Sequence, residues 1–120
     1  MANNIQDTFS LAFANEYKAE NHHIKAEYDE AIISFESARD LYKTIGHIKN
    51  AFHCSYRIGD SYRISGDSEK AMVLFEDLKD LSDVDSLVIV KAKAFQGISG
   101  VYHGKKKMDS AAYYLSLIHI

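Results

Sequence analysis

Apolar residues recur every three or four positions along this chain, and the spacing predicts six α-helices. The clearest stretch is 28–43, where Ala31, Phe35 and Ala38 follow the i, i+3, i+4 rule of a helix with one buried face. The same pattern predicts further helices at about residues 4–25, 47–65, 69–81, 86–103 and from 109 onward. The absence of proline fits long, uninterrupted helices.

Short connections separate these predicted helices. Gly46 can take a left-handed conformation at a helix end, and Gly66 ends the helix before it. Asp67 or Ser68 can cap the next helix, because either side chain can accept a hydrogen bond from a free backbone amide. Residues 82–85 are predicted to form a turn. Because the connections are short, we expect consecutive helices to pair as antiparallel hairpins.

Small and aromatic residues repeat at a fixed interval of 40 residues. The repeated positions are Ala19, Gly59 and Ser99; His22, Tyr62 and Tyr102; Ala31, Ala71 and Ala111; and Phe35, Phe75 and Leu115. Periods of about 20–50 residues are typical of stacked repeats, in which each hairpin covers the bare face of its neighbour. We therefore expect an all-α domain of tandem antiparallel hairpins over residues 1–114, with repeats at about 4–45, 46–83 and 84–114. Small residues should lie where helices approach closely, with aromatic rings between them.

The middle of the chain resembles the tetratricopeptide repeat. The residues that carry the resemblance are Ile58, Gly59, Tyr62, Gly66, Asp67, Ala71 and Phe75. Residues 26–38 and 98–111 match in part: His22 replaces an aromatic residue in the first copy, and Lys106 replaces the turn glycine in the third. The family period is about 34 residues. The 40-residue period of this chain is similar to that of longer repeats in bacterial signalling and regulatory proteins.

The resemblance implies a right-handed α-solenoid of three repeats and six helices. Its concave groove would be lined by the first helix of each hairpin and would hold an extended peptide or a partner helix. The groove positions that carry over are Glu16, Glu20, His23, His53, Tyr56, Asp60, Arg63, Lys93, Gln96 and His103, with Phe13, Ile24, Ile64 and Gly100 beside them. We expect protein–protein recognition as a scaffold or adaptor, without catalysis.

The charges in this groove bear on the kind of partner. Some tetratricopeptide domains bind the acidic C-terminal tails of chaperones with lysines and asparagines. Here Glu16, Glu20 and Asp60 stand at those positions, and only Lys93 matches. Because carboxylates would repel an acidic tail, we expect a partner of basic or mixed character.

Two other functions stay open from the sequence. The chain could be the sensory or regulatory segment of a longer signalling protein, such as a histidine kinase or a transcription regulator. The stretch His22-His23-Ile24-Lys25 is similar to the phosphoacceptor segment of histidine phosphotransfer bundles. Ala26 stands where those segments carry glycine, and those bundles lack a 40-residue repeat, so we expect no phosphotransfer enzyme.

Composition narrows the class of protein further. Apolar residues make up 47% of the chain and charged residues 26%, which is typical of a folded domain. A mixed charge of -3 argues against non-specific binding of nucleic acid. Cys54 is the single cysteine, so no internal disulfide can form. With no signal peptide and no apolar run long enough to span a membrane, we expect a cytoplasmic protein without a membrane partner.

Histidines and the cysteine do not predict a metal site. Zinc needs three or four ligands that converge on one point. His22 and His23 are adjacent and point about 100° apart on a helix, and His53 and Cys54 have the same relation. We therefore expect no metal and no other cofactor.

The last six residues, 115–120, match the peptide that a transposon adapter of sequencing libraries encodes. The alternative is a natural apolar helix end; we favour a scar and expect the natural chain to continue beyond Tyr114. Leu115 is therefore the weakest member of the 40-residue repeat.

Overall fold

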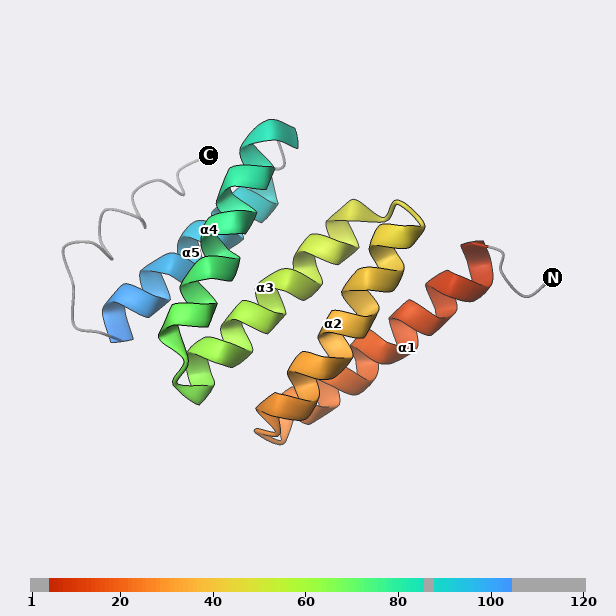
Figure 1. Cartoon of the computed structure of the whole chain (residues 1–120), viewed down its shortest axis with the longest axis horizontal. Helices are drawn as coiled ribbons and strands as arrows, with labels where there is room; N and C mark the ends of the chain where they lie inside the picture. Colours follow the sequence, from red (N-terminus) through yellow and green to blue (C-terminus); the bar gives the residue numbers. More distant parts are fainter. Residues whose placement is uncertain (1–4, 86–87, 105–120) are drawn as a thin grey trace.

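The computed structural model describes residues 5–85 and 88–104, which form helices and short connections (Figure 1). The helices are α1 (Ile5–Ile24), α2 (Tyr28–Thr44), α3 (Ile48–Ser65), α4 (Ser68–Asp85) and α5 (Val88–Gly104). The all-α expectation is confirmed for these residues. The predicted sixth helix and residues 115–120 lie outside the described residues.

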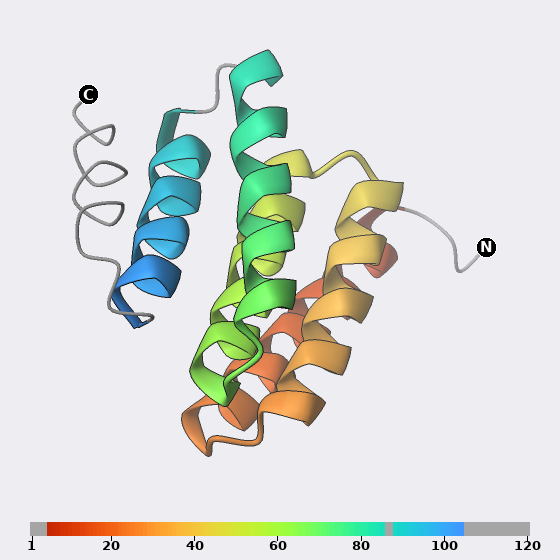
Figure 2. The ribbon, with the colours of Figure 1, turned by 60° about the vertical axis from the view of Figure 1, so that its left-hand side comes forward.

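Consecutive helices run antiparallel and form an elongated slab of 54 × 33 × 18 Å (Figure 1). α2 packs against α1 and α3, α4 packs against α3 and α5, and α3 also contacts α5. Figure 2 shows α2 in front of α1 and α4 in front of α3, so the odd-numbered helices and the even-numbered helices form two layers. Within the described ranges, no helix combines the length and the apolar character of a membrane span.

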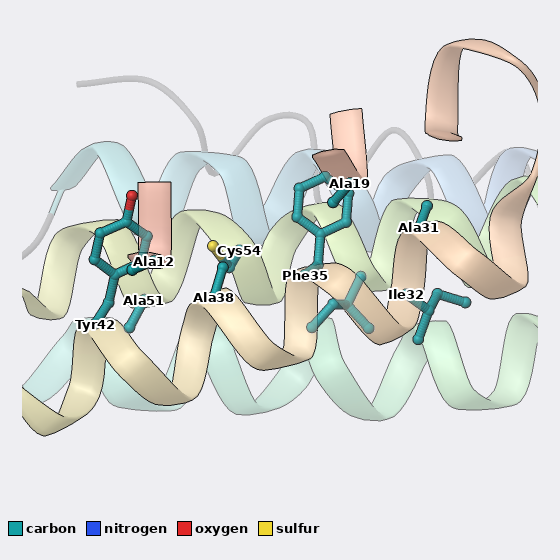
Figure 3. Packing of buried hydrophobic residues seen from close by; sticks show 10 residues of the cluster. Ala12, Ala19, Ala31, Ile32, Phe35, Ala38, Tyr42, Ala51 and Cys54 are labelled. Atoms are coloured by element: carbon teal, nitrogen blue, oxygen red, sulfur yellow. The ribbon is translucent and has the colours of Figure 1, made fainter. Parts of the chain in front are cut away.

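Two clusters of buried side chains form the core, one between α1, α2 and α3 and one between α3, α4 and α5. In the first, the rings of Phe35 and Tyr42 project from α2 beside Ala19 and Ala12 of α1 (Figure 3). Six residues of the first cluster have a counterpart in the second cluster 40 residues later in the sequence. The pairs are Ala12 and Phe52, Ala31 and Ala71, Phe35 and Phe75, Ala38 and Leu78, Cys54 and Ala94, and Ile58 and Ile98. The sequence interval thus corresponds to two equivalent sets of packed side chains.

The ring of Phe75 is fully buried between α3 and α5, and two glycines make room for it. A Cβ added at Gly59 would lie 2.6 Å from Phe75 Cε1, and one at Gly97 would lie 2.5 Å from the same atom. At the position equivalent to Gly97, α3 carries Arg57, whose guanidinium carbon lies 5.8 Å from the centre of the Phe35 ring. α3 and α5 therefore approach across a bare backbone, whereas α1 and α3 are separated by a long charged side chain.

The predicted helix ends at Gly46 and Gly66 are confirmed. Their φ angles are 79° and 102°, in the left-handed region that glycine adopts without a steric penalty. Asp67 caps α4, because its Oδ1 accepts a hydrogen bond of 3.2 Å from the backbone N–H of Lys70.

The predicted turn at residues 82–85 is wrong, because α4 continues to Asp85. The segment Ser82-Asp83-Val84-Asp85 contains neither glycine nor proline, and its residues are only mildly unfavourable in a helix. Polar residues alone did not suffice to end the helix.

Ala26, which follows α1, has a φ of 61° and is the one non-glycine residue in the described ranges with a positive φ. Gly66 holds the equivalent place after α3. The same backbone hydrogen bond closes both turns: Glu27 N–H donates to the His22 carbonyl at 2.9 Å, and Asp67 N–H donates to the Tyr62 carbonyl at 2.8 Å. The first turn therefore adopts a glycine conformation without a glycine.

Replacing this alanine should stabilise the protein. We expect Ala26→Gly to raise the free energy of unfolding by about 1 kcal/mol, because a left-handed conformation costs L-residues about that much. Urea unfolding measures the change. Ala14→Gly, at an exposed position inside α1, is the control and should instead lose about 1 kcal/mol. A loss of stability in both variants would contradict the assignment of the turn.

Candidate functional site

Polar side chains from α1, α3 and α5 converge on one face of the slab. We call this surface the polar face; its described members are Glu16, Glu20 and His23 of α1, His53, Tyr56, Arg57, Asp60 and Arg63 of α3, and Lys93 of α5. Gln96, which the sequence also predicted here, is exposed on α5. The side chain of His103 lies outside the described part of the structure.

Arg57 is the centre of the polar face and was missed by the sequence prediction. Its guanidinium donates two hydrogen bonds to Glu20, of 2.8 and 3.0 Å, and one of 3.3 Å to Asp60. Arg63 binds the other oxygen of Asp60 at 2.6 Å. Asp60 is buried and receives both arginines, so it links α3 to α1 through Arg57. The signal was present in the sequence, because residues three apart on a helix are neighbours.

His23 lies against this arginine with a defined protonation state. Arg57 Nη2 is 3.3 Å from His23 Nδ1. Because a guanidinium can only donate, Nδ1 must accept, and the ring is neutral with its proton on Nε2. That nitrogen is buried, makes no hydrogen bond and lies 3.9 Å from Asp60 Oδ2. The ring of Tyr28 packs edge-on against His23 from α2.

Glu16 forms a second polar contact between the layers. The hydroxyl of Tyr42 donates a 2.8 Å hydrogen bond to Glu16 Oε1, and His53 Nε2 lies 3.7 Å from Glu16 Oε2. Burial, followed by the hydrogen bond to Glu16, raises the pKa of the Tyr42 hydroxyl far above its usual 10. Tyr42 therefore acts as a neutral donor that fixes this carboxylate in place.

On the α5 side of the polar face, Lys93 of α5 reaches toward α3, and Arg63 of α3 reaches toward α5. The Lys93 ammonium lies 5.1 Å from the centre of the Tyr56 ring, within the range of a cation–π contact. The side chain of Arg63 lies over the backbone of Gly100, where an added Cβ would be 3.2 Å from its Cδ. Helix α5 contains no carboxylate in its sequence, so this side is the more basic one.

Charges on the polar face are balanced. The three carboxylates Glu16, Glu20 and Asp60 are equal in number to the basic side chains Arg57, Arg63 and Lys93. The acidic residues that argued against an acidic partner are thus held in contacts within the protein. The polar face therefore repels an acidic partner less strongly than the number of its carboxylates alone suggests.

Exposed apolar side chains border the polar face on α1. Phe13 is 58% exposed, Tyr17 66% and Ile24 80%, and their spacing places them on one side of the helix. Ile64 of α3 is also exposed. Polar groups that fix orientation beside apolar groups that gain from burial are the usual components of a protein-binding surface.

Cys54 belongs to the core rather than to the polar face. Its side chain is fully buried, and burial raises the pKa of the thiol to about 12. The thiol is therefore protonated and inaccessible, as expected for a small packing residue. Among the described residues, no three of the His, Cys, Asp and Glu side chains are arranged to hold a metal ion.

Acid should destabilise the protein through His23. Burial, and then the Arg57 guanidinium, lower the pKa of His23 from its usual 6.5. The unfolded chain therefore takes up a proton at higher pH than the folded one does, so this stability is complete above pH 6.5 and is lost as the pH falls through the folded pKa. We expect a lower free energy of unfolding at pH 5.5 than at pH 7.5 by urea titration, and a smaller difference in His23→Gln. An equal difference in both proteins would contradict the assignment.

Comparison of the chain with protein-family models, with curated proteins and with solved structures finds no match. The tetratricopeptide resemblance and the groove therefore stay predictions from the residues. The site described above rests on the geometry of this chain alone.

Proposed function

We propose that the protein is a protein–protein interaction module that binds an extended segment or a partner helix across the polar face. In this proposal the helices form a right-handed solenoid of tetratricopeptide-like hairpins, with the sixth helix completing the third repeat. The support for the repeat is the 40-residue relation between the two buried clusters. The support for binding is the convergence of polar side chains from α1, α3 and α5 beside exposed Phe13, Tyr17 and Ile24.

The partner that suits this surface combines apolar and charged side chains. Its apolar residues would cover the exposed side chains of α1, and its polar residues would meet Gln96, Lys93 and the backbone beside Gly100. The balanced ion pairs of the polar face would then fix orientation and specificity more than affinity. The same surface would serve a free-standing adaptor or the sensory segment of a longer signalling protein.

Phosphotransfer is the less favoured function on geometric grounds. His23 offers no free nitrogen, because Nδ1 receives Arg57 and Nε2 is buried. His22 lies outside the polar face, and its Nδ1 is 2.8 Å from Glu27 Oε1. Incubation with a phosphorylated receiver domain should leave the protein unlabelled.

A selection from a displayed library of random linear peptides tests the binding proposal. We expect enriched peptides whose affinity falls about tenfold or more in Lys93→Glu, because the substitution reverses a charge on the polar face. Lys43→Glu, an equal change of charge at an exposed position of α2, is the matched control and should bind as the wild type does. Arg63 is a poorer probe, because reversing its charge would also break the pair with Asp60.

Either of two results would overturn the proposal. One is a library that yields no enriched peptide. The other is equal binding by the wild type, Lys93→Glu and Lys43→Glu, which would place the peptide on another surface.

A further inference from the structure

The two contacts between odd-numbered helices differ in chemistry. We call the contact between α1 and α3 the first joint and the contact between α3 and α5 the second joint. The first is held by Arg57, which bridges Glu20 and Asp60. The second is built on bare backbone, with Phe75 packed between Gly59 and Gly97. The position that carries Arg57 in the first joint carries Gly97 in the second, so a charged side chain separates the helices at this position in the first joint only. In the second joint, Lys93 and Arg63 reach across the helices elsewhere.

The first joint also contains the neutral His23. The charged and titratable groups that face its ring are Glu20 from α1, Tyr28 from α2, and Arg57 and Asp60 from α3. Nδ1 accepts from Arg57, and Nε2 lies 3.9 Å from Asp60 Oδ2, beyond hydrogen-bond distance. The joint is therefore arranged for the neutral ring and leaves one favourable contact unmade.

Protonation of His23 at Nδ1 changes its contacts with both Arg57 and Asp60. The nitrogen can no longer accept, so the hydrogen bond from Arg57 is lost and two cations face each other at 3.3 Å. The imidazolium is attracted to the carboxylate of Asp60, which Arg57 already binds. The ring and the guanidinium then compete for one carboxylate, and a movement of α1 relative to α3 would relieve this competition.

We propose that the first joint is a proton-operated switch, in which uptake of a proton from solvent by His23 breaks its contact with Arg57 and loosens α1 from α3, while the second joint keeps its geometry. The lowered pKa of His23 places the switch on the acid side of pH 6.5. The buried contacts between α2 and α3 keep the first hairpin attached, so the change is a pivot rather than unfolding.

Distances between spin labels in the full chain test this switch. One label pair, at Lys18 of α1 and Lys49 of α3, spans the first joint; the other, at Lys49 and Gln96 of α5, spans the second. All three sites are exposed, and Cys54→Ala removes the native thiol. Between pH 7.5 and pH 5.0 we expect the first distance to shift or broaden and the second to stay unchanged.

Three histidine variants separate the groups that could respond. His23→Gln should abolish the shift of the first distance, because glutamine does not titrate. His22→Gln, which alters the adjacent histidine outside the joint, should keep it. His53 of α3 faces Glu16 and Glu20 of α1 and Lys93 of α5, and burial lowers its pKa as well. His53→Gln should also keep the shift.

Any of three results would contradict the proposal of a switch. They are an unchanged first distance in the wild type, an equal shift of both distances, or a shift that survives in His23→Gln. No ligand is used, so the outcome is independent of whether the polar face binds peptides.

Discussion

Phe75→Ala is expected to lower the free energy of unfolding by about 3–5 kcal/mol, the range for truncation of a buried aromatic side chain. The ring is fully buried and touches α3, α4 and α5, so its loss leaves a cavity shared by three helices. Gly59 and Gly97 cannot fill that cavity, because they have no side chains. Most of the second cluster would lose its central contact.

Urea unfolding followed by circular dichroism measures this loss. Val73→Ala is the matched control, because Val73 lies two residues away on α4 and is 61% exposed. It should change stability by less than about 0.5 kcal/mol. A loss below about 1 kcal/mol in Phe75→Ala would show that the ring is not the centre of this core.

Gly97→Ala should also destabilise the protein, although alanine favours a helix. The added methyl would lie 2.5 Å from Phe75 Cε1, and the fully buried ring is also closely packed against the backbone of Gly59, so it has little room to move. Overpacking costs about 1–3 kcal/mol, whereas helix propensity returns about 1 kcal/mol. We expect a net loss of about 1–2 kcal/mol in urea unfolding.

Two further variants isolate the steric cause. Gly100→Ala, one turn along α5, meets the flexible side chain of Arg63 at 3.2 Å and should be neutral or stabilising by up to about 1 kcal/mol. In a Phe75→Leu background, Gly97→Ala should cost less than in the wild type, because leucine lacks Cε1 and Cζ, two of the three ring atoms that the added methyl meets. Equal losses in Gly97→Ala and Gly100→Ala would contradict the close approach.

The helices were predictable because their signals are local. Apolar spacing located all five described helices, and Gly46 and Gly66 ended two of them where expected. The end of α4 was missed because residues 82–85 lack a glycine or a proline, so only packing can decide where that helix ends.

The polar face was predictable only in part, because its chemistry depends on distances between helices. The resemblance identified Glu20, Asp60 and Arg63 but treated them as groups free to meet a partner. The structure joins them through Arg57, a residue that the family positions did not include. The spacing of Arg57, Asp60 and Arg63 at intervals of three could have indicated the cluster. The bridge from Arg57 to Glu20 could not have been foreseen, because it spans two helices.

Nuclear Overhauser contacts of the two equivalent phenylalanine rings test the stacking of hairpins most directly. We predict that the Phe75 ring contacts the α-protons of Gly59 and Gly97 at once, and that the Phe35 ring contacts the Ala19 methyl and the Arg57 side chain. These contacts would place both rings at the same position of two adjacent units. Contacts from Phe75 to only one of the glycines, or a Phe35 ring remote from α3, would contradict the stacked arrangement.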